Sequence, residues 1–259
     1  MKKQVKMKYF FRGKMLLLIC GLAGVLSAGC QKDYYADGGL ADPHYAGSIY
    51  DYLANDPYYF DTITYIIDRA GMKTVLQEDT VTFFSPTDDA IKGAMDDLNS
   101  YRYTNLEDSV HLEDISPEVW RYFLSMYILE GKFTANKFPR VDPNNIFSYP
   151  GINYVMYDGY VLNIGLIYQD YGGAEAVGAR ILNLTDITYN PSDFRKDPKV
   201  QIATSDIQPL NGVLHVLKNS HVFGFRQGEF KRIAEQYLLL GDPSKSPASA
   251  YRKNKNIFR

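Results

Sequence analysis

Apolar residues recur at helical spacing in four parts of the chain. In residues 59–70 they fall three or four positions apart on one face, which predicts an amphipathic helix that ends at Gly71. The same periodicity predicts helices over residues 48–53, 117–129 and 229–240. The apolar residues of 117–129 fall on one face, and residues 229–240 predict an amphipathic helix that closes the domain.

Other segments have the composition of strands. Residues 80–84 predict a strand that leads directly into a helix start, with Ser85 and Asp88 at capping-box spacing and a proline at the first helical position. In the second half, residues 154–157 and 160–162 flank an Asp-Gly pair typical of a two-residue hairpin turn.

Further strands are expected over residues 179–185 and 213–217, the second of them after an Asn-Gly turn. Helices therefore dominate the first half of the chain and short strands the second. This order predicts an α+β domain rather than alternating parallel α/β units.

The first residues have the order of a secretory signal. Several bases precede a nearly continuous apolar run over residues 15–26, and small residues lead to Cys30. The run is shorter than the roughly 20 residues of a permanent membrane helix, so we interpret residues 1–29 as a cleaved signal peptide.

The residues before Cys30 resemble a bacterial lipobox, which implies a lipoprotein carrying palmitate-type acyl chains on that cysteine. The second cysteine, Cys20, lies inside the apolar run, so the mature chain would keep one thiol, and acylation would account for it. A conventional signal peptide with cleavage nearby is the alternative.

Residues 30–44 lack periodicity and are interpreted as a lipid-anchored tether. Gln31, Lys32 and Asp33 resemble the short signal that directs lipoproteins to the outer face of the outer membrane, the alternative being a merely polar spacer. The expected location is the outer membrane, lipid-anchored and exposed at the cell surface, with its periplasmic face as the other possibility. Residues 226–259 are expected to form the closing helix and a basic tail.

Charge narrows the choice of partners. The whole chain has 28 Lys and Arg against 30 Asp and Glu, and removal of the six bases in residues 1–29 leaves a net charge of −8. Nucleic-acid binding needs a basic face, so it is not expected. Contact with the membrane is expected through the lipid anchor only.

Two segments resemble the signatures of the fasciclin family. Residues 81–91, Val-Thr-Phe-Phe-Ser-Pro-Thr-Asp-Asp-Ala-Ile, match a strand that runs into a Thr-Pro-type turn and helix, and residues 204–217 match the later Asp-Ile and Asn-Gly-Val-Leu-His pattern. The resemblance covers residues 45–225 and implies a single fasciclin-like domain, in which helices pack on a wedge of short strands. The matched positions are Pro86, Thr87, Asp88, Asp206, Ile207, Asn211, Gly212 and His215.

The resemblance also implies an adhesion-type binding module without catalytic residues. The tyrosine-histidine pair that animal members use falls on Met126 and Tyr127, so the histidine is missing here. We interpret His215 as structural, because a lone histidine in a strand is more often a core residue than a catalyst. Serine-hydrolase and phosphate-binding motifs, metal-ligand spacing and cofactor motifs are absent from the sequence, so no metal and no cofactor are predicted.

The unmatched middle of the chain is rich in tyrosine, which suits wet recognition of proteins or sugars. A possible binding face comprises Tyr149, Tyr154, Tyr157 and Tyr160, the alternative for each being ordinary strand packing. The leading hypothesis is a surface lipoprotein that binds a protein or glycan. An accessory structural subunit of an outer-membrane glycan-uptake complex is the second hypothesis, and a glycan-active enzyme is the third.

Overall fold

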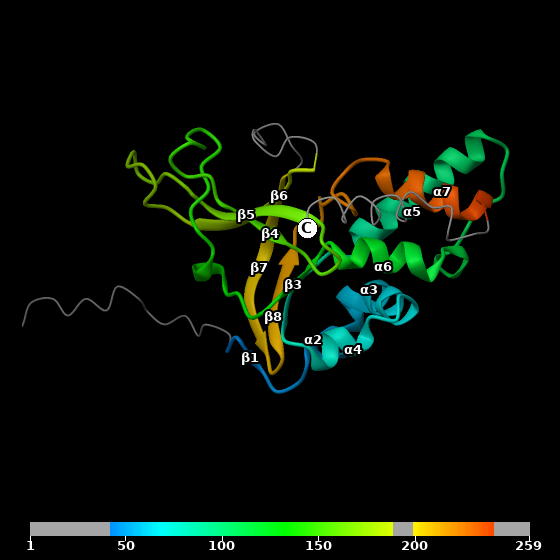
Figure 1. The fold of residues 1–259 in the computed structure, drawn as a ribbon, viewed down its shortest axis with the longest axis horizontal. Helices are drawn as coiled ribbons and strands as arrows, with labels where there is room; N and C mark the ends of the chain where they lie inside the picture. The colour runs from blue at the N-terminus through cyan, green and yellow to red at the C-terminus, as the bar shows by residue number, and fades with distance from the viewer. Residues whose placement is uncertain (1–41, 189–198, 241–259) are drawn as a thin grey trace, which may run out of the picture. The chain divides into compact units, whose positions relative to one another are not determined.

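The computed structural model describes residues 42–188 and 199–240 (Figure 1). The predicted signal peptide, Cys30, most of the tether and the basic tail lie outside these residues. Within the described ranges, no helix has both the length and the apolar composition needed to cross a membrane.

Helices occupy most of the first half of the domain and close its end. They are α2 (Ile49–Asn55), α3 (Pro57–Arg69), α4 (Lys73–Glu78), α5 (Asp88–Thr104), α6 (Pro117–Ser125) and α7 (Glu229–Leu240), with short 3₁₀ turns η1 (Leu112–Asp114) and η2 (Ala135–Lys137). Ser48 and Asp51 form the reciprocal capping box that begins α2. Gly71, at φ +64°, follows α3 where the sequence predicts a stop.

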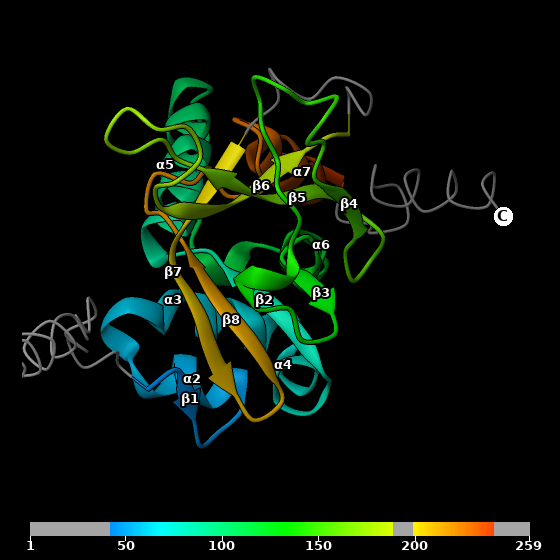
Figure 2. The ribbon, with the colours of Figure 1, turned by 90° about the vertical axis from the view of Figure 1, so that its left-hand side faces the viewer.

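The strands form one sheet, in the order β3-β2-β8-β7-β6-β5-β4, with β1 added beside β7. Their bounds are β1 (His44–Tyr45), β2 (Val81–Ser85), β3 (Ile128–Glu130), β4 (Ile152–Val155), β5 (Val161–Tyr168), β6 (Arg180–Asp186), β7 (Lys199–Pro209) and β8 (Gly212–Leu217). The pairs β2–β8 and β1–β7 are parallel, and the others are antiparallel. Helices gather on one side of the sheet (Figures 1 and 2). The prediction of an α+β class is therefore confirmed.

The capping box predicted between Ser85 and Asp88 is wrong. Ser85 belongs to β2 because its backbone lies in register with Val216 of β8, and its hydroxyl donates to the carbonyl of Pro86. Helix α5 begins only at Asp88, after Thr87, which makes no side-chain cap. Pairing with β8 thus extends the strand to Ser85, the residue that the sequence assigned to the helix start.

The helix predicted over residues 117–129 is also too long. Helix α6 ends at Ser125, and Ile128–Glu130 forms β3 against β2. Apolar periodicity continues past the true helix end because residues 128 and 129 are buried in a strand rather than in a helix.

The predicted hairpin around Asp158 and Gly159 is present, although its loop is longer than two residues. The backbone N–H of Met156 donates to the carbonyl of Tyr160 at 2.7 Å, so the chain turns over the three residues 157–159 that lie between this hydrogen-bonded pair. Gly159 has φ +83°, a conformation that glycine adopts without strain.

One hydrophobic core joins the helices to the sheet. Side chains from α2, α3, β2, α6 and β8 are buried together, and Phe230, Ile233 and Ala234 of α7 belong to the same core. At the other end, His44 in β1 pairs with Gln208 of β7. The domain limits predicted at residues 45 and 225 stay predictions.

The parallel pair β2–β8 brings the two fasciclin-like segments together. Phe83 lies opposite Leu214 and Phe84 opposite His215, although these segments are far apart in sequence. Gly212 is required where the strands begin to pair, because a Cβ there would stand 2.0 Å from the carbonyl oxygen of Val81. The two segments are thus one structural unit at the centre of the sheet.

Candidate functional site

The polar residues of the second fasciclin-like segment serve internal hydrogen bonds. The side chain of Asn211 accepts the N–H of Ile49 at 2.8 Å and donates to the carbonyls of Leu76 and Asp79 at 3.1 and 2.9 Å. It therefore ties the β7–β8 turn to both ends of the segment formed by α2 and α4. Both N–H groups and the oxygen of its amide thus take part in internal hydrogen bonds.

His215 is a structural residue as well. Its Nδ1 accepts the N–H of Asp206 at 3.3 Å, and the opposite ring nitrogen then donates to the carbonyl of Phe133 at 2.9 Å. The ring is fully buried and stacks on Phe84 at 5.3 Å. Burial lowers the pKa of His215, so the imidazole is neutral at pH 7.

Asp206 belongs to the same internal hydrogen-bond network as His215. It has φ +64° within an irregular part of β7, and its carboxylate accepts the N–H of Ala135 at 2.6 Å. The neighbouring Ile207 contacts the hydrophobic core and lines the cleft described below. In this chain the Asp-Ile step therefore anchors η2 to β7.

Tyr127 pairs with His221, a histidine outside the fasciclin-like segments. Its hydroxyl donates to Nε2 of His221 at 2.7 Å and accepts the N–H of Gly224 at 2.7 Å. All three groups are buried, and burial lowers the pKa of His221 to about 3. The pair is a core contact, formed by residues that lie 94 positions apart.

The four tyrosines predicted as a possible face do not share one exposed surface. Tyr160 is buried, and Tyr154 packs edge-on against Phe133 and Phe138. Tyr149 stands apart and stacks with the Arg140 guanidinium, 3.9 Å from its ring centre. Tyr157 is half-buried against the core. A tyrosine packed in this way has little ring surface left to offer a ligand, so strand packing accounts for Tyr154 and Tyr160.

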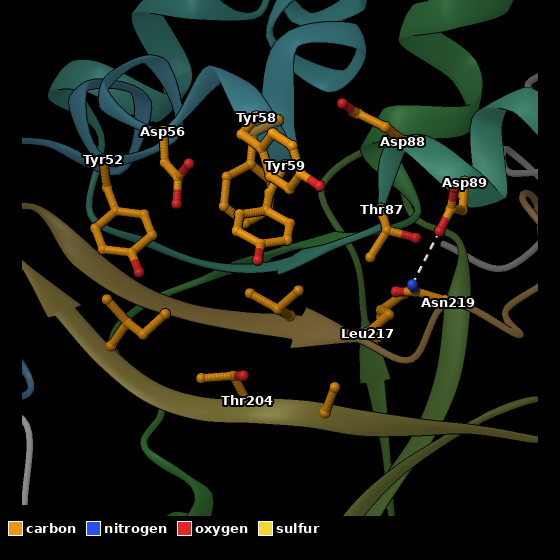
Figure 3. Close-up of a pocket in the computed structure, with 14 residues that line it drawn as sticks. Tyr52, Asp56, Tyr58, Tyr59, Thr87, Asp88, Asp89, Thr204, Leu217 and Asn219 are labelled. Atoms are coloured by element: carbon orange, nitrogen blue, oxygen red, sulfur yellow. Dashed lines mark hydrogen bonds between the residues drawn. The ribbon is translucent and has the colours of Figure 1, made fainter.

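The structure instead brings a different set of tyrosines together in a cleft of about 540 Å³, here called the tyrosine cleft (Figure 3). One wall is formed by the end of α2 and the start of α3, and the facing wall by β7 and β8. The start of α5 closes one end. Its lining residues are Tyr52, Asp56, Tyr58, Tyr59, Phe60, Thr87, Asp88, Asp89, Ala203, Thr204, Ile207, Val216, Leu217 and Asn219.

A break in α3 places the two most exposed of these rings. Pro57 begins the helix, and Phe60 then departs from helical geometry with φ −138° and ψ 21°. Tyr58 and Tyr59, just before this break, are 83% and 60% exposed and meet edge to face at 4.8 Å. Each ring thus limits the motion of the other while remaining open to solvent.

Asp88, a matched position of the first fasciclin-like segment, restarts α3 after the break. Its carboxylate accepts the N–H groups of Thr62 and Ile63 at 3.3 and 2.9 Å. These two donors would otherwise lack partners, because the break removes the preceding helical turn. Asp88 therefore acts as a helix cap supplied by α5, and it fixes the wall that carries Tyr58 and Tyr59.

Asp88 also shares a proton with Asp61. Burial and the hydrogen bond that its protonated form donates to Asp61 raise the pKa of Asp88 to about 6, whereas accepting this hydrogen bond lowers the pKa of Asp61. The two carboxyl groups titrate as a pair, with one of them protonated below about pH 6. The negative charge of this wall therefore increases between pH 5 and pH 7.

The tyrosine cleft is acidic. Asp56, Asp88 and Asp89 line it, and none of its described lining residues is a lysine, arginine or histidine. The Asp89 carboxylate accepts the side-chain amide of Asn219 at 2.9 Å. Within residues 42–188 and 199–240, no group of three or more His, Cys, Asp or Glu side chains is placed to hold a metal ion. The arrangement is suited to recognition through aromatic faces and carboxylates.

Thr87, Asp88 and Ile207 of this cleft were predicted from the fasciclin-like segments of the sequence. Tyr58 and Tyr59 were not predicted, because a helical pattern does not reveal a local break. Two consecutive tyrosines directly after a proline are the signal that could have drawn attention to them.

Comparisons with known proteins find similarity to solved structures only. No protein-family model and no curated protein sequence matches the chain. The chain is similar to the solved structure of a FAS1 domain pair from the insect cell adhesion molecule fasciclin I, with 12% sequence identity and a TM-score of 0.45. The match covers 71% of this chain and 52% of the other, so the chain matches about half the length of that domain pair.

Proposed function

We propose that this protein is a non-enzymatic, adhesion-type binding module that recognises a macromolecular partner through the tyrosine cleft. The observation that supports this most directly is the pair of exposed rings, Tyr58 and Tyr59, at the edge of an acidic cleft. Tyrosine is enriched where proteins bind partners, because it offers a large apolar area and a hydroxyl together.

The polar residues of the second fasciclin-like segment are more consistent with a binding role than with a catalytic one. Asn211, Asp206 and His215 are committed to internal hydrogen bonds, so none of them is left free to activate a nucleophile. The pKa of Asp88 near 6 would suit a general acid, but its oxygens hold the N–H groups of α3.

We further propose that acyl chains on Cys30 hold the mature protein in the outer membrane, with the domain at the cell surface. The support lies in the signal-like order of residues 1–29 and the lipobox resemblance before Cys30. More than one acyl chain would make the anchorage stable. A Cys30→Ser variant is expected to incorporate no radiolabelled palmitate, and an unlabelled wild-type protein would refute the lipid anchor.

The binding role is tested by site-specific photocrosslinking on intact cells. A benzophenone amino acid replaces Tyr58 in the cleft or, as a control, Tyr103 at the end of α5, which is 81% exposed. We expect adducts with a discrete partner from position 58 and none from position 103. Equal labelling from both positions would contradict a role for the cleft.

The same experiment separates the hypotheses. Protease treatment of the cells beforehand should remove the domain if it is surface-exposed, and full protection would refute surface exposure. Adducts with external protein or glycan support adhesion, whereas adducts with proteins of the cell's own outer membrane support an accessory subunit of an uptake complex. Hydrolysis of a glycan panel by the purified protein would refute the non-enzymatic role.

A further inference from the structure

The charge of the tyrosine cleft identifies a class of ligand. The Asp56 carboxylate, between α2 and α3, receives no hydrogen bond or ion pair from any residue of the described ranges. Asp89 accepts the Asn219 amide and interacts electrostatically with Lys92, which lies outside the lining, and Asp88 bonds backbone groups and Asp61. The carboxylates that line the cleft are therefore not neutralised by any cation in its described lining.

The aromatic groups lie beside these charges. Figure 3 shows Tyr58 and Tyr59 between Asp56 and Asp88, above the strands that carry Thr204 and Leu217. The face of a tyrosine ring attracts a cation electrostatically, and a nearby carboxylate adds a charge-assisted hydrogen bond. The exposed rings and the unneutralised carboxylates thus both favour a cationic ligand.

We infer that the tyrosine cleft binds arginine or lysine side chains of a protein partner. This inference rests on the proposed function and adds the chemistry of the ligand. An anionic segment would meet like charges without a counter-charge, and a neutral glycan would leave the carboxylates without a cationic partner. A guanidinium or ammonium group satisfies the rings and the carboxylates together, and the cleft volume of about 540 Å³ accommodates a side chain of this size.

The test compares peptides that differ in charge alone. The full-length lipidated protein in neutral detergent is titrated calorimetrically at pH 7.5 with Ac-(Gly-Arg)₃-NH₂ and with the same peptide carrying citrulline, the uncharged isostere of arginine. We expect the arginine peptide to bind at least tenfold more tightly and its affinity to fall severalfold between low and moderate salt. Equal affinity of the two peptides, or no binding of the arginine peptide, would overturn the inference.

Matched variants separate the cleft from the general negative charge of the protein. Asp56→Asn and Glu78→Gln remove one charge each, but Glu78 lies on α4 outside the cleft lining. We expect Asp56→Asn to weaken the arginine peptide at least fivefold and Glu78→Gln to leave it unchanged. Tyr58→Ala should weaken it similarly, and Tyr103→Ala should not. Equal effects within either pair would overturn the inference.

One outcome would refute the cationic ligand but leave the proposed binding function intact. If a neutral oligosaccharide or the citrulline peptide binds, and Tyr58→Ala abolishes that binding, the cleft remains a binding site and only the cationic ligand class is refuted. If crosslinking from position 58 yields no partner on cells, the proposed function itself fails. The two failures are thus distinguishable.

Discussion

Removal of the Tyr127 hydroxyl is expected to destabilise the domain by about 2–3 kcal/mol. Tyr127→Phe leaves the Nε2 acceptor of His221 and the N–H of Gly224 without the partners that each has at 2.7 Å. A buried polar group left unpaired costs about 1–3 kcal/mol, so two such groups cost about 2–6 kcal/mol. The lower part of this range applies, because the variant no longer buries a hydroxyl of its own. The ring still stacks on Phe223 and Phe225, so no large cavity forms.

The measurement is urea unfolding followed by tryptophan fluorescence. The chain has one tryptophan, Trp120, which is fully buried and stacks on Phe230 at 5.2 Å, so its emission reports the core. Tyr50→Phe is the matched control, since it loses one bond at 2.9 Å to the solvent-exposed Asp68 and should cost about 1 kcal/mol or less. A loss below about 1 kcal/mol in Tyr127→Phe, at an unchanged denaturant slope, would refute this account of the buried Tyr–His contact.

Two further variants test the architecture. The pKa of Asp88 is raised from 3.8 to about 6 in the folded state, so the folded protein binds a proton that the unfolded protein has lost between these pH values. The free energy of unfolding therefore falls as the pH rises from about 4 to about 6. The lowered pKa of Asp61 affects the free energy of unfolding only below pH 3.8. Asp88→Asn, which mimics the protonated carboxyl, should remove this decline in unfolding titrations from pH 4 to 7, and an unchanged slope would contradict the assignment. Gly212→Ala would place its Cβ 2.0 Å from the Val81 carbonyl oxygen, so it should lower the free energy of unfolding in urea by about 3 kcal/mol or more. Gly93→Ala, the control, lies at an open helical position and should raise this free energy by up to about 1 kcal/mol. Similar effects of the two variants would refute the close approach of β2 and β8.

The sequence was informative wherever local pattern and tertiary structure agree. The start predicted for the last helix, residue 229, coincides with the start of α7, and Phe230 and Ile233 of its apolar stripe pack on the core as expected. The pattern failed where tertiary pairing overrides it. Ile128 and Leu129 continue a helical stripe, yet they pair with Phe83 and Thr82 as strand β3.

The tyrosine cleft was beyond the reach of local pattern for a different reason. Its helical walls come from residues 52–60 and 87–89, and its strand wall comes from residues 203–219, more than 100 positions later in the sequence. The exposure of Tyr58 depends on the helix break at Phe60, and that break is supported by a carboxylate from another helix. A sequence pattern reports periodicity within one segment and carries no information on such a contact.

The fasciclin-like segments have a structural role that is separate from the binding role proposed for the tyrosine cleft. Asn211 and His215 fasten loops to the central strands, and Gly212 permits the strands to approach, so these residues have no free group with which to choose a ligand. Asp88 connects the two roles, because it caps α3 from within the first segment and thereby positions Tyr58. Changes at Tyr58 or Asp56 should therefore alter binding while the sheet is retained, whereas changes at Asn211 should destabilise the domain whatever ligand it binds.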